Sequence, residues 1–349
     1  MDLTPELLRR APKVLLHDHL DGGLRPETVL DLARSVGHQL PATDPSGLAR
    51  WFFQGGRGAD LDLYLAAFGH TVALLQTEAA LIRVARECVE DLDADGVVHA
   101  EVRYAPELST AGGLHLDAVF DAVAEGLAAG PPTIEVRLLC CIMRQGARGD
   151  EVVTAALRAR DRGVPVVGVD LAGPEVGFPA SRHAGALRRA RDAGLHLTLH
   201  AGEAVGPASI ADALDQGAER LGHGVRIVED LAADGTPGPV AERVLAGGVA
   251  LELCPTSNVH TGVVDQLVDH PVDRLRRAGF RITVSTDNRL MSGVSLSGEL
   301  AATAAGHGWQ LEDVRAVTDT AAEVAFVDDE AARAALRGRI ERGFAALVP

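Results

Sequence analysis

Aromatic residues are scarce in this chain, and it has neither a long apolar run nor an excess of basic charge. Only 3% of its 349 residues are Phe, Trp or Tyr, and the formal net charge is -16. An acidic chain without a Lys/Arg-rich patch repels a polyphosphate backbone, so nucleic acid is not an expected partner. The N-terminus lacks the apolar core and cleavage site of a secretory signal, and no segment stays apolar long enough to cross a bilayer. We therefore predict a cytoplasmic protein with no membrane partner.

Cysteine is rare as well. The four cysteines are Cys88, Cys140, Cys141 and Cys254, and none of them forms a Cys-x-x-Cys motif for zinc or redox chemistry. We expect them to be small buried apolar residues. With 47% hydrophobic residues, the chain has ample material for a core, and we predict that residues 1–349 form a single domain. A monomer is the default expectation, although the sequence is compatible with an oligomer.

Short β-rich apolar runs alternate with helix-compatible segments along the chain. The predicted strands are residues 14–19, 96–104, 134–143, 166–173, 195–203, 220–225, 249–255 and 280–288. Parallel strands need crossover connections, so eight strand–helix units favour an α/β fold of the (β/α)8 TIM-barrel type. Further C-terminal helices are predicted at 297–307, 310–325 and 329–346. A doubly wound sheet is the alternative, but no Gly-x-Gly-x-x-Gly follows the first strand.

Residues suited to metal binding and acid–base chemistry stand at or just past the C-terminal ends of predicted strands, where barrel active sites are built. They are His17, His19, His200, Glu203, His223 and Asp287. His17 and His19 are two residues apart, so both imidazoles point to one face of the strand and Asp18 to the other. The pair alone is equally compatible with an exposed strand. Because His200 and Asp287 converge on the same barrel mouth, we predict that these four residues bind one zinc ion per subunit.

A zinc ion in this position would make hydrolysis feasible. Bound zinc lowers the pKa of its water to about 7, which provides a nucleophile at neutral pH. Glu203 can act as general acid/base by giving a proton to a ring nitrogen, so that the adjacent carbon becomes electrophilic. His223 can orient the nucleophile. Five other histidines are expected to be ordinary solvated or packed residues: His38, His70, His115, His183 and His307.

Seven segments, in this order, resemble the adenosine deaminase family: HDHLDGGLRPETVLDLA from His17, EVRYAPEL from Glu101, VDLAGPEVGFP from Val169, LHAGE, LGHGVRI, LCPTSN and VSTDN. The resemblance covers nearly the whole chain. It implies a zinc enzyme on a (β/α)8 barrel, with His17, His19, His200 and Asp287 as metal ligands. It further implies that Glu203 donates a proton to purine N1 and that His223 assists the nucleophile.

The resemblance also implies a set of substrate-binding residues, namely His19, Asp21, Gly173 and Asn288. Asp21 would bind the ribose hydroxyls, and the backbone amide of Gly173 would donate to purine N3. Without the resemblance, Asp21 and Gly173 would be interpreted as turn residues.

The chain departs from the family at one site position. The family usually has two consecutive carboxylates after the eighth strand, whereas here Asn288 follows Asp287. In the family the second carboxylate faces purine N7, an acceptor, and must be protonated to bond it, while an amide NH2 donates at any pH. We therefore expect binding to be preserved. Any pH dependence that rests on the second acid is in doubt, and the change could mark a shift in substrate.

Residues 51–68 hold five of the chain's twelve aromatic residues. This segment resembles the family's apolar helical lid after the first strand, and lids of this kind exclude water from the site. A helical pair that packs its aromatic side chains against the barrel is an equally good interpretation, and the two are compatible.

The favoured function is zinc-dependent hydrolytic deamination of adenosine and 2′-deoxyadenosine to inosine and 2′-deoxyinosine, with release of ammonia, in purine salvage. Adenine and 5′-extended nucleosides such as aminodeoxyfutalosine stay open as substrates, although Asp21 favours a ribose. AMP is disfavoured because no basic cluster near these motifs offers to hold a phosphate. The partner is thus a small purine nucleoside.

Three other classes of protein fit the sequence less well. His99-Ala100-Glu101 matches half of the cytidine-deaminase signature, but no Pro-Cys-x-x-Cys follows anywhere. A binuclear amidohydrolase usually has a bridging lysine on a middle strand, and residues 166–173 contain none. A non-catalytic purine-binding protein is disfavoured because every catalytic and metal-binding position holds a competent residue.

Overall fold

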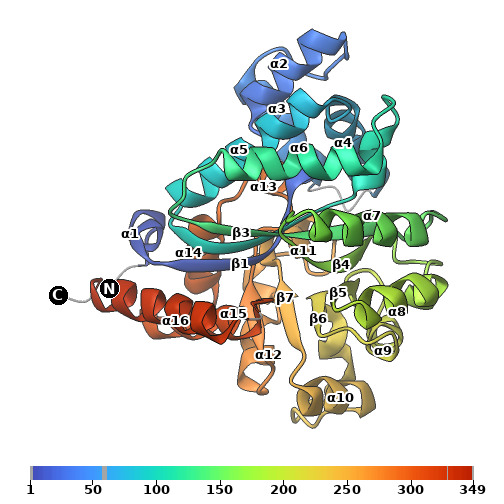
Figure 1. The fold of residues 1–349 in the computed structure, drawn as a ribbon. Coiled ribbons are helices and arrows are strands. Elements are labelled where there is room, and N and C mark those ends of the chain that lie inside the picture. Colours follow the sequence, from blue (N-terminus) through green and yellow to red (C-terminus); the bar gives the residue numbers. More distant parts are fainter. Residues whose placement is uncertain (1–2, 57–60, 328, 348–349) are drawn as a thin grey trace.

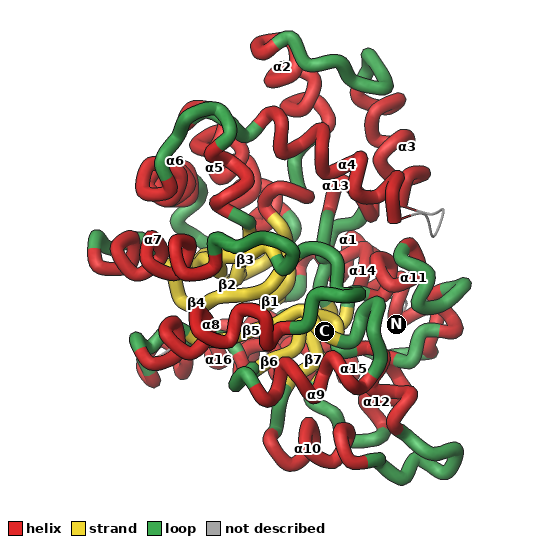
Figure 2. Tube along the Cα trace, turned by 90° about the vertical axis from the view of Figure 1, so that its right-hand side faces the viewer, coloured by secondary structure: helices red, strands yellow, loops and turns green. Residues whose placement is uncertain are grey.

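The computed structural model describes residues 3–56, 61–327 and 329–347, without the side chains of residues 55–66. Its strands are β1 (Lys13–His19), β2 (Val97–Tyr104), β3 (Glu135–Met143), β4 (Val166–Ala172), β5 (His196–Ala201), β6 (Arg220–His223), β7 (Ala250–Leu253) and β8 (Ile282–Val284). They pair in parallel in sequence order, and helices surround them (Figures 1 and 2). The predicted strands and the barrel are confirmed.

Backbone hydrogen bonds from a residue just beyond β8 link the last strand of the barrel to the first. The Asp287 amide donates to the His17 carbonyl at 3.0 Å, and the His19 amide donates to the Asp287 carbonyl at 2.8 Å. This pairing brings Asp287 beside two histidines that lie some 270 positions earlier in the chain. Asp287 has a φ of 57° and His223 a φ of 59°. Non-glycine residues adopt this left-handed region at an energetic cost, and such residues cluster at functional sites.

Helices between successive strands supply the crossovers. They are α5 (Glu78–Ala94), α6 (Leu116–Ala128), α7 (Gly149–Asp161), α8 (Ala184–Asp192), α9 (Pro207–Asp215), α10 (Pro239–Gly247) and α12 (Val272–Arg277). Three short helices, α1 (Pro5–Arg10), α11 (Pro255–His260) and α13 (Arg289–Ser292), stand at strand ends. The predicted C-terminal helices are present as α14 (Leu296–His307), α15 (Leu311–Val324) and α16 (Glu330–Ala345). Side chains of Ser295 and Asp329 cap α14 and α16, as their positions before apolar helical runs favour.

Additional helices follow β1 before the crossover helix α5. They are α2 (Pro26–Val36), α3 (Pro45–Gly56) and α4 (Leu61–Leu74), which lie together beyond one side of the barrel (Figure 1). Phe52 is fully buried in the core, whereas Phe68 lines the cavity at the barrel mouth. The aromatic side chains of this segment therefore serve both packing and the cavity wall. Tyr64, which belongs to the predicted lid, lies outside the described side chains.

Two composition-based expectations can be compared with the structure. All four cysteine side chains are buried and none is in a disulfide, as predicted. Among the described residues, no helix has the length and apolarity that a bilayer crossing requires. The single-domain organisation, the cytoplasmic location and the monomeric state stay predictions.

Candidate metal centre and active site

A cavity of about 300 Å³ opens at the C-terminal ends of the strands. All the residues predicted for the site line this cavity except His17, which is fully buried beneath it. The lining residues from the prediction are His19, Asp21, Gly173, His200, Glu203, His223, Asp287 and Asn288. The barrel thus brings together residues from the ends of five strands, β1, β4, β5, β6 and β8, at one mouth, as barrel enzymes do.

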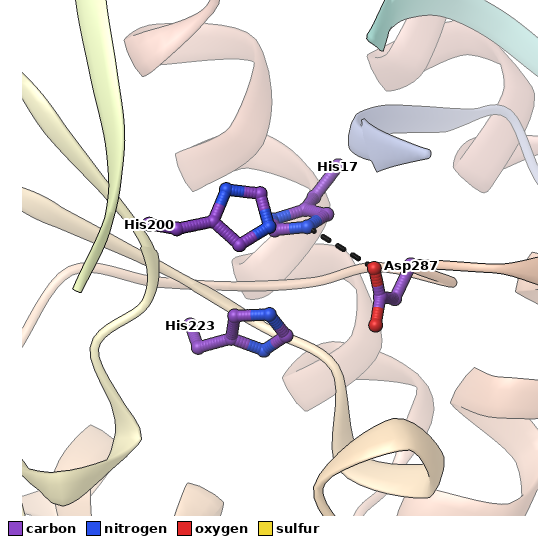
Figure 3. Close-up of side chains that lie close together, drawn as sticks. All are labelled: His17, His200, His223 and Asp287. Atoms are coloured by element: carbon purple, nitrogen blue, oxygen red, sulfur yellow. Dashed lines mark ion pairs between the residues drawn. The ribbon is translucent and has the colours of Figure 1, made fainter. Parts of the chain in front are cut away.

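Four side chains converge most closely at the base of this cavity. One nitrogen each from His17, His200 and His223 and one oxygen of Asp287 all lie within 4.8 Å of one another, and Figure 3 shows the three imidazole rings and the Asp287 carboxylate close together. His19 Nε2 lies 3.3 Å from His200 Nε2 and 3.4 Å from Asp287 Oδ1. Five candidate ligands therefore surround the centre, one more than the four predicted.

Buried carboxylates orient two of these histidines. His17 Nδ1 lies 3.1 Å from Glu252 Oε2, and His200 Nδ1 lies 2.8 Å from Asp170 Oδ2. A carboxylate accepts hydrogen bonds, so each Nδ1 carries the proton and each Nε2 directs a lone pair at the centre. Such carboxylate–histidine pairs are typical of metal sites.

Arg103 keeps both carboxylates in place and ionised. Its Nη1 donates to Asp170 at 2.6 Å, and its Nη2 donates to Glu252 at 2.7 Å. Burial alone would raise the pKa of Asp170 and Glu252, but their hydrogen-bonded and charged partners lower it below the ordinary range; these are His200 and Arg103 for Asp170, and Arg103 and Arg220 for Glu252. The carboxylates that orient the two histidines are thus fixed in position and negatively charged inside the barrel.

The donor set fits a bound cation. His19 Nε2 and His200 Nε2 face each other at 3.3 Å, and His17 Nε2 is buried without a hydrogen-bond partner among the described residues. Lone pairs turned toward one another repel unless a cation lies between them. Asp287 adds a carboxylate to the centre, and its Oδ2 accepts from Ser257 Oγ at 2.6 Å. Imidazole nitrogens with one carboxylate are ligands that zinc accepts.

Glu203 stands on a loop that a second glutamate holds. The backbone amides of Gly202, Glu203, Ala204 and Val205 donate to the carboxylate of Glu175 at 2.6–3.2 Å. Burial alone would raise the pKa of Glu175, but bonds from Ser209 and these amides lower it below its ordinary value. The Glu203 carboxylate itself lies 3.6 Å from His223 Nε2. The predicted acid–base pair is therefore close together beside the metal centre.

The predicted substrate-binding residues lie around the same cavity. Asp21 is buried, and burial raises its pKa to about 6; its Oδ1 has no hydrogen-bond partner among the described residues. Gly173 has a φ of 93°, and a Cβ there would lie 2.5 Å from Gln145 Oε1, so this wall position requires glycine. The Asn288 side chain packs so closely on Gly22 that a Cβ at residue 22 would lie 1.9 Å from its Oδ1.

Comparison with known proteins decides the family. The sequence profile described as adenosine deaminase matches residues 12–342. The chain belongs to the adenosine deaminase family. A relative from Mycobacteroides abscessus named adenosine deaminase is 48% identical over 363 residues, covering 99% of this chain and 100% of the relative. One of the same name from Mycobacterium tuberculosis is 48% identical over 360 residues, covering 99% and 98%.

Solved structures within the same fold carry different substrate names. An adenine deaminase from Arthrobacter aurescens superposes with a TM-score of 0.83 at 28% identity, covering 95% of this chain and 98% of that one. The N6-methyl-AMP deaminase from Arabidopsis thaliana superposes with a TM-score of 0.82 at 28% identity, covering 97% and 98%. A shared fold does not determine the substrate, so the residues around the cavity must.

Sequence reasoning missed the residues that support this adenosine deaminase-type centre. They are Arg103, Asp170, Glu175, Glu252, Ser257, Asn258 and His270. One signal was present: Asp170 and Glu252 are single charges inside otherwise apolar strands, and Arg103 lies with Glu101 in a third strand that is largely apolar. Charged residues are almost never buried unless they are paired. The partner of each charge, however, comes from another strand and could not be read from spacing.

The buried carboxylate of Glu299 on α14 hydrogen-bonds α11, the helix that carries Ser257 and Asn258. Its carboxylate accepts from the Thr256 amide at 2.6 Å and from Thr256 Oγ1 at 2.5 Å. Burial raises the pKa of Glu299 from 4.5 to about 7. Between these values the folded chain binds more protons than the unfolded chain, so this group makes unfolding easier as pH rises.

When pH rises from about 5 to about 8, the unfolding free energy of the wild type should therefore fall relative to that of the Glu299→Gln variant, by roughly 1–3 kcal/mol. Urea midpoints at the two pH values measure this difference. Glu242→Gln, an exposed change on α10, is the matched control and should follow the wild type. Parallel pH curves for Glu299→Gln and the wild type would contradict the assignment.

Proposed function

We propose that this protein is a zinc-dependent adenosine deaminase that converts adenosine and 2′-deoxyadenosine to inosine and 2′-deoxyinosine, with release of ammonia, in purine salvage. The observation that carries the proposal is that the ligand cluster lies at the base of the cavity that Glu203 and His223 line. The named activity of relatives at 48% identity over nearly the full length supports the same substrate.

The proposed metal ligands are His17, His19, His200 and Asp287. When bound, the ion supplies a water that is nucleophilic at neutral pH. Glu203 is placed to donate a proton to N1 of the purine, which makes C6 electrophilic. His223 is placed to hydrogen-bond the attacking water and orient it toward C6. Departure of ammonia after attack at C6 leaves the 6-oxopurine.

The rest of the cavity would bind the nucleoside. Asp21 presents a buried carboxylate oxygen to the ribose hydroxyls, and the Gly173 amide stands on the wall that would face N3. Asn288 offers an amide donor to N7. Phe68, Leu108 and Met143 add an apolar wall, which would exclude water from the purine.

The charge of the cavity wall favours a nucleoside over a nucleotide. No lysine or arginine is among the described residues that line the cavity. A phosphate taken up there would lose its hydration without a charge-assisted hydrogen bond in return. Adenine would leave Asp21 buried without a ribose partner. These two features rank adenosine above AMP and above adenine, while a neutral 5′-extension stays the second candidate because the cavity opens to solvent.

The proposal predicts a ranking of substrates. Purified protein of known metal content should convert adenosine and deoxyadenosine, with kcat/KM for AMP lower by on the order of 10–100-fold. The loss of the ultraviolet absorbance that distinguishes adenine from hypoxanthine measures conversion, and adenine and a 5′-substituted adenosine are run beside them. Faster conversion of the 5′-substituted compound would favour the second candidate. If zinc is present and none of these compounds is converted, the proposal is contradicted.

A further inference from the structure

His223 differs from the other histidines at the centre in what lies behind its ring. His17 and His200 have carboxylates at Nδ1, whereas His223 Nδ1 lies 3.2 Å from Asn258 Nδ2. Asn258 Oδ1 in turn lies 3.1 Å from Nε2 of His270. All three side chains are buried, with 3% exposure or less. The proton positions in this series of contacts decide what His223 presents to the cavity.

The series has a fixed direction because it begins at a backbone amide. The Val272 N–H donates to His270 Nδ1 at 3.1 Å, and an amide can only donate. His270 Nδ1 is therefore an acceptor, and its Nε2 carries the proton of the neutral ring. Burial lowers the pKa of His270 to about 3, with His307 and His223 adding to the effect. The ring is thus neutral at physiological pH.

Each later step follows from the one before. His270 Nε2–H donates to the oxygen of Asn258, which turns the amide nitrogen of Asn258 toward His223. An amide nitrogen donates and does not accept. His223 Nδ1 is therefore the acceptor, and the proton of the neutral ring lies on Nε2, which faces Glu203 at 3.6 Å.

We propose that Asn258 and His270 are positioning residues that fix the Nε2–H tautomer of His223. A nitrogen that carries a proton has no lone pair for a metal, so His223 is excluded from the ligand set although its ring lies among the ligands. His17 and His200 have the opposite tautomer, with the lone pair at the centre. His19, beside His200 and Asp287, then supplies the remaining nitrogen ligand.

This inference rests on the proposed function only for its kinetic consequence. The Nε2–H of His223 is the donor that would orient the attacking water, and Asn258 and His270 act through His223 without touching the substrate. The tautomer itself can be measured without substrate. Failure of the deaminase proposal and failure of this inference are therefore distinguishable.

The direct test is a long-range ¹H–¹⁵N correlation spectrum of ¹⁵N-histidine-labelled protein as purified with its metal. A His223→Gln variant assigns the His223 signals. We expect a protonated Nε2 and an unprotonated Nδ1 on His223. A wild-type His223 with the proton on Nδ1 would overturn the inference, whether or not the protein deaminates adenosine.

Two variants of Asn258 and one of His270 test the consequence. Asn258→Asp offers acceptors on both sides and should move the His223 proton to Nδ1, with kcat lower by on the order of 10²-fold or more and KM little changed. Asn258→Leu removes the donor without adding charge and should also lower kcat by at least about tenfold. His270→Gln keeps an amide donor for the Asn258 oxygen and should retain kcat within about threefold.

Metal content and melting temperature are measured for each variant, so that loss of the ion or of the fold is recognised. Full activity in Asn258→Leu would show that the effect of Asn258→Asp is one of charge and would overturn the inference. An equal loss in His270→Gln, with the His223 tautomer unchanged, would show a merely structural role and would overturn it as well.

Discussion

Replacement of Glu203 by glutamine should lower kcat for adenosine by about 10²–10⁴-fold while zinc content and nucleoside binding persist. Glutamine keeps the size and one acceptor of the side chain but cannot give a proton to N1. The ligand cluster does not include Glu203, and the backbone amide of residue 203 would still donate to Glu175. The loop should therefore stay in place, so the loss isolates proton transfer.

The measurements are steady-state kinetics, metal analysis and binding of a non-reactive purine nucleoside. Glu242→Gln makes the same chemical change at an exposed position on α10 and should keep wild-type activity. If Glu203→Gln deaminated adenosine at the wild-type rate, the proposed proton donor would be wrong. A loss of zinc in that variant would instead assign Glu203 a structural part in the metal centre.

Replacement of His17 by alanine should remove the metal and, with it, nearly all activity. His17 is fully buried and lies between Glu252 and Asp287, at 3.1 and 3.4 Å. Of the five candidate ligands among the described residues, His17 is the one that does not line the cavity. We expect the metal content after dialysis to fall by at least about tenfold. Loss of a ligand should lower metal affinity by more than the 10–100-fold that is typical of a supporting residue.

Chelation and melting provide the independent readout. A ligand that binds only the folded chain raises its stability, so a chelator should lower the melting temperature of the wild type and leave that of His17→Ala unchanged. His115→Ala, at an exposed position before α6, is the matched control and should respond as the wild type does. A His17→Ala variant that retained stoichiometric zinc would remove His17 from the ligand set.

The strands and the histidines at their ends could be predicted from the sequence, because apolar runs and positions along them are local features of the chain. Alternation correctly places His17 and His19 on one face of β1 and Asp18 on the other, where Asp18 pairs with Arg289 at 2.9 Å. The parallel direction of the strands followed from the helical segments between them, because parallel strands need crossover connections. Even the buried charges of β2, β4 and β7 were visible as breaks in apolar runs, although their purpose was not.

The sequence by itself determined the barrel and the residues at its mouth, because apolar runs, crossover segments and strand-end positions are local properties of the chain, and its motifs carried the resemblance to the family. Only the tertiary structure decided how those residues are protonated and held. The carboxylates behind His17 and His200, and the series from Val272 through His270 and Asn258 to His223, join atoms from different strands and helices. A hydrogen-bond direction depends on which partner lies across the barrel, and no spacing along the chain encodes that partner.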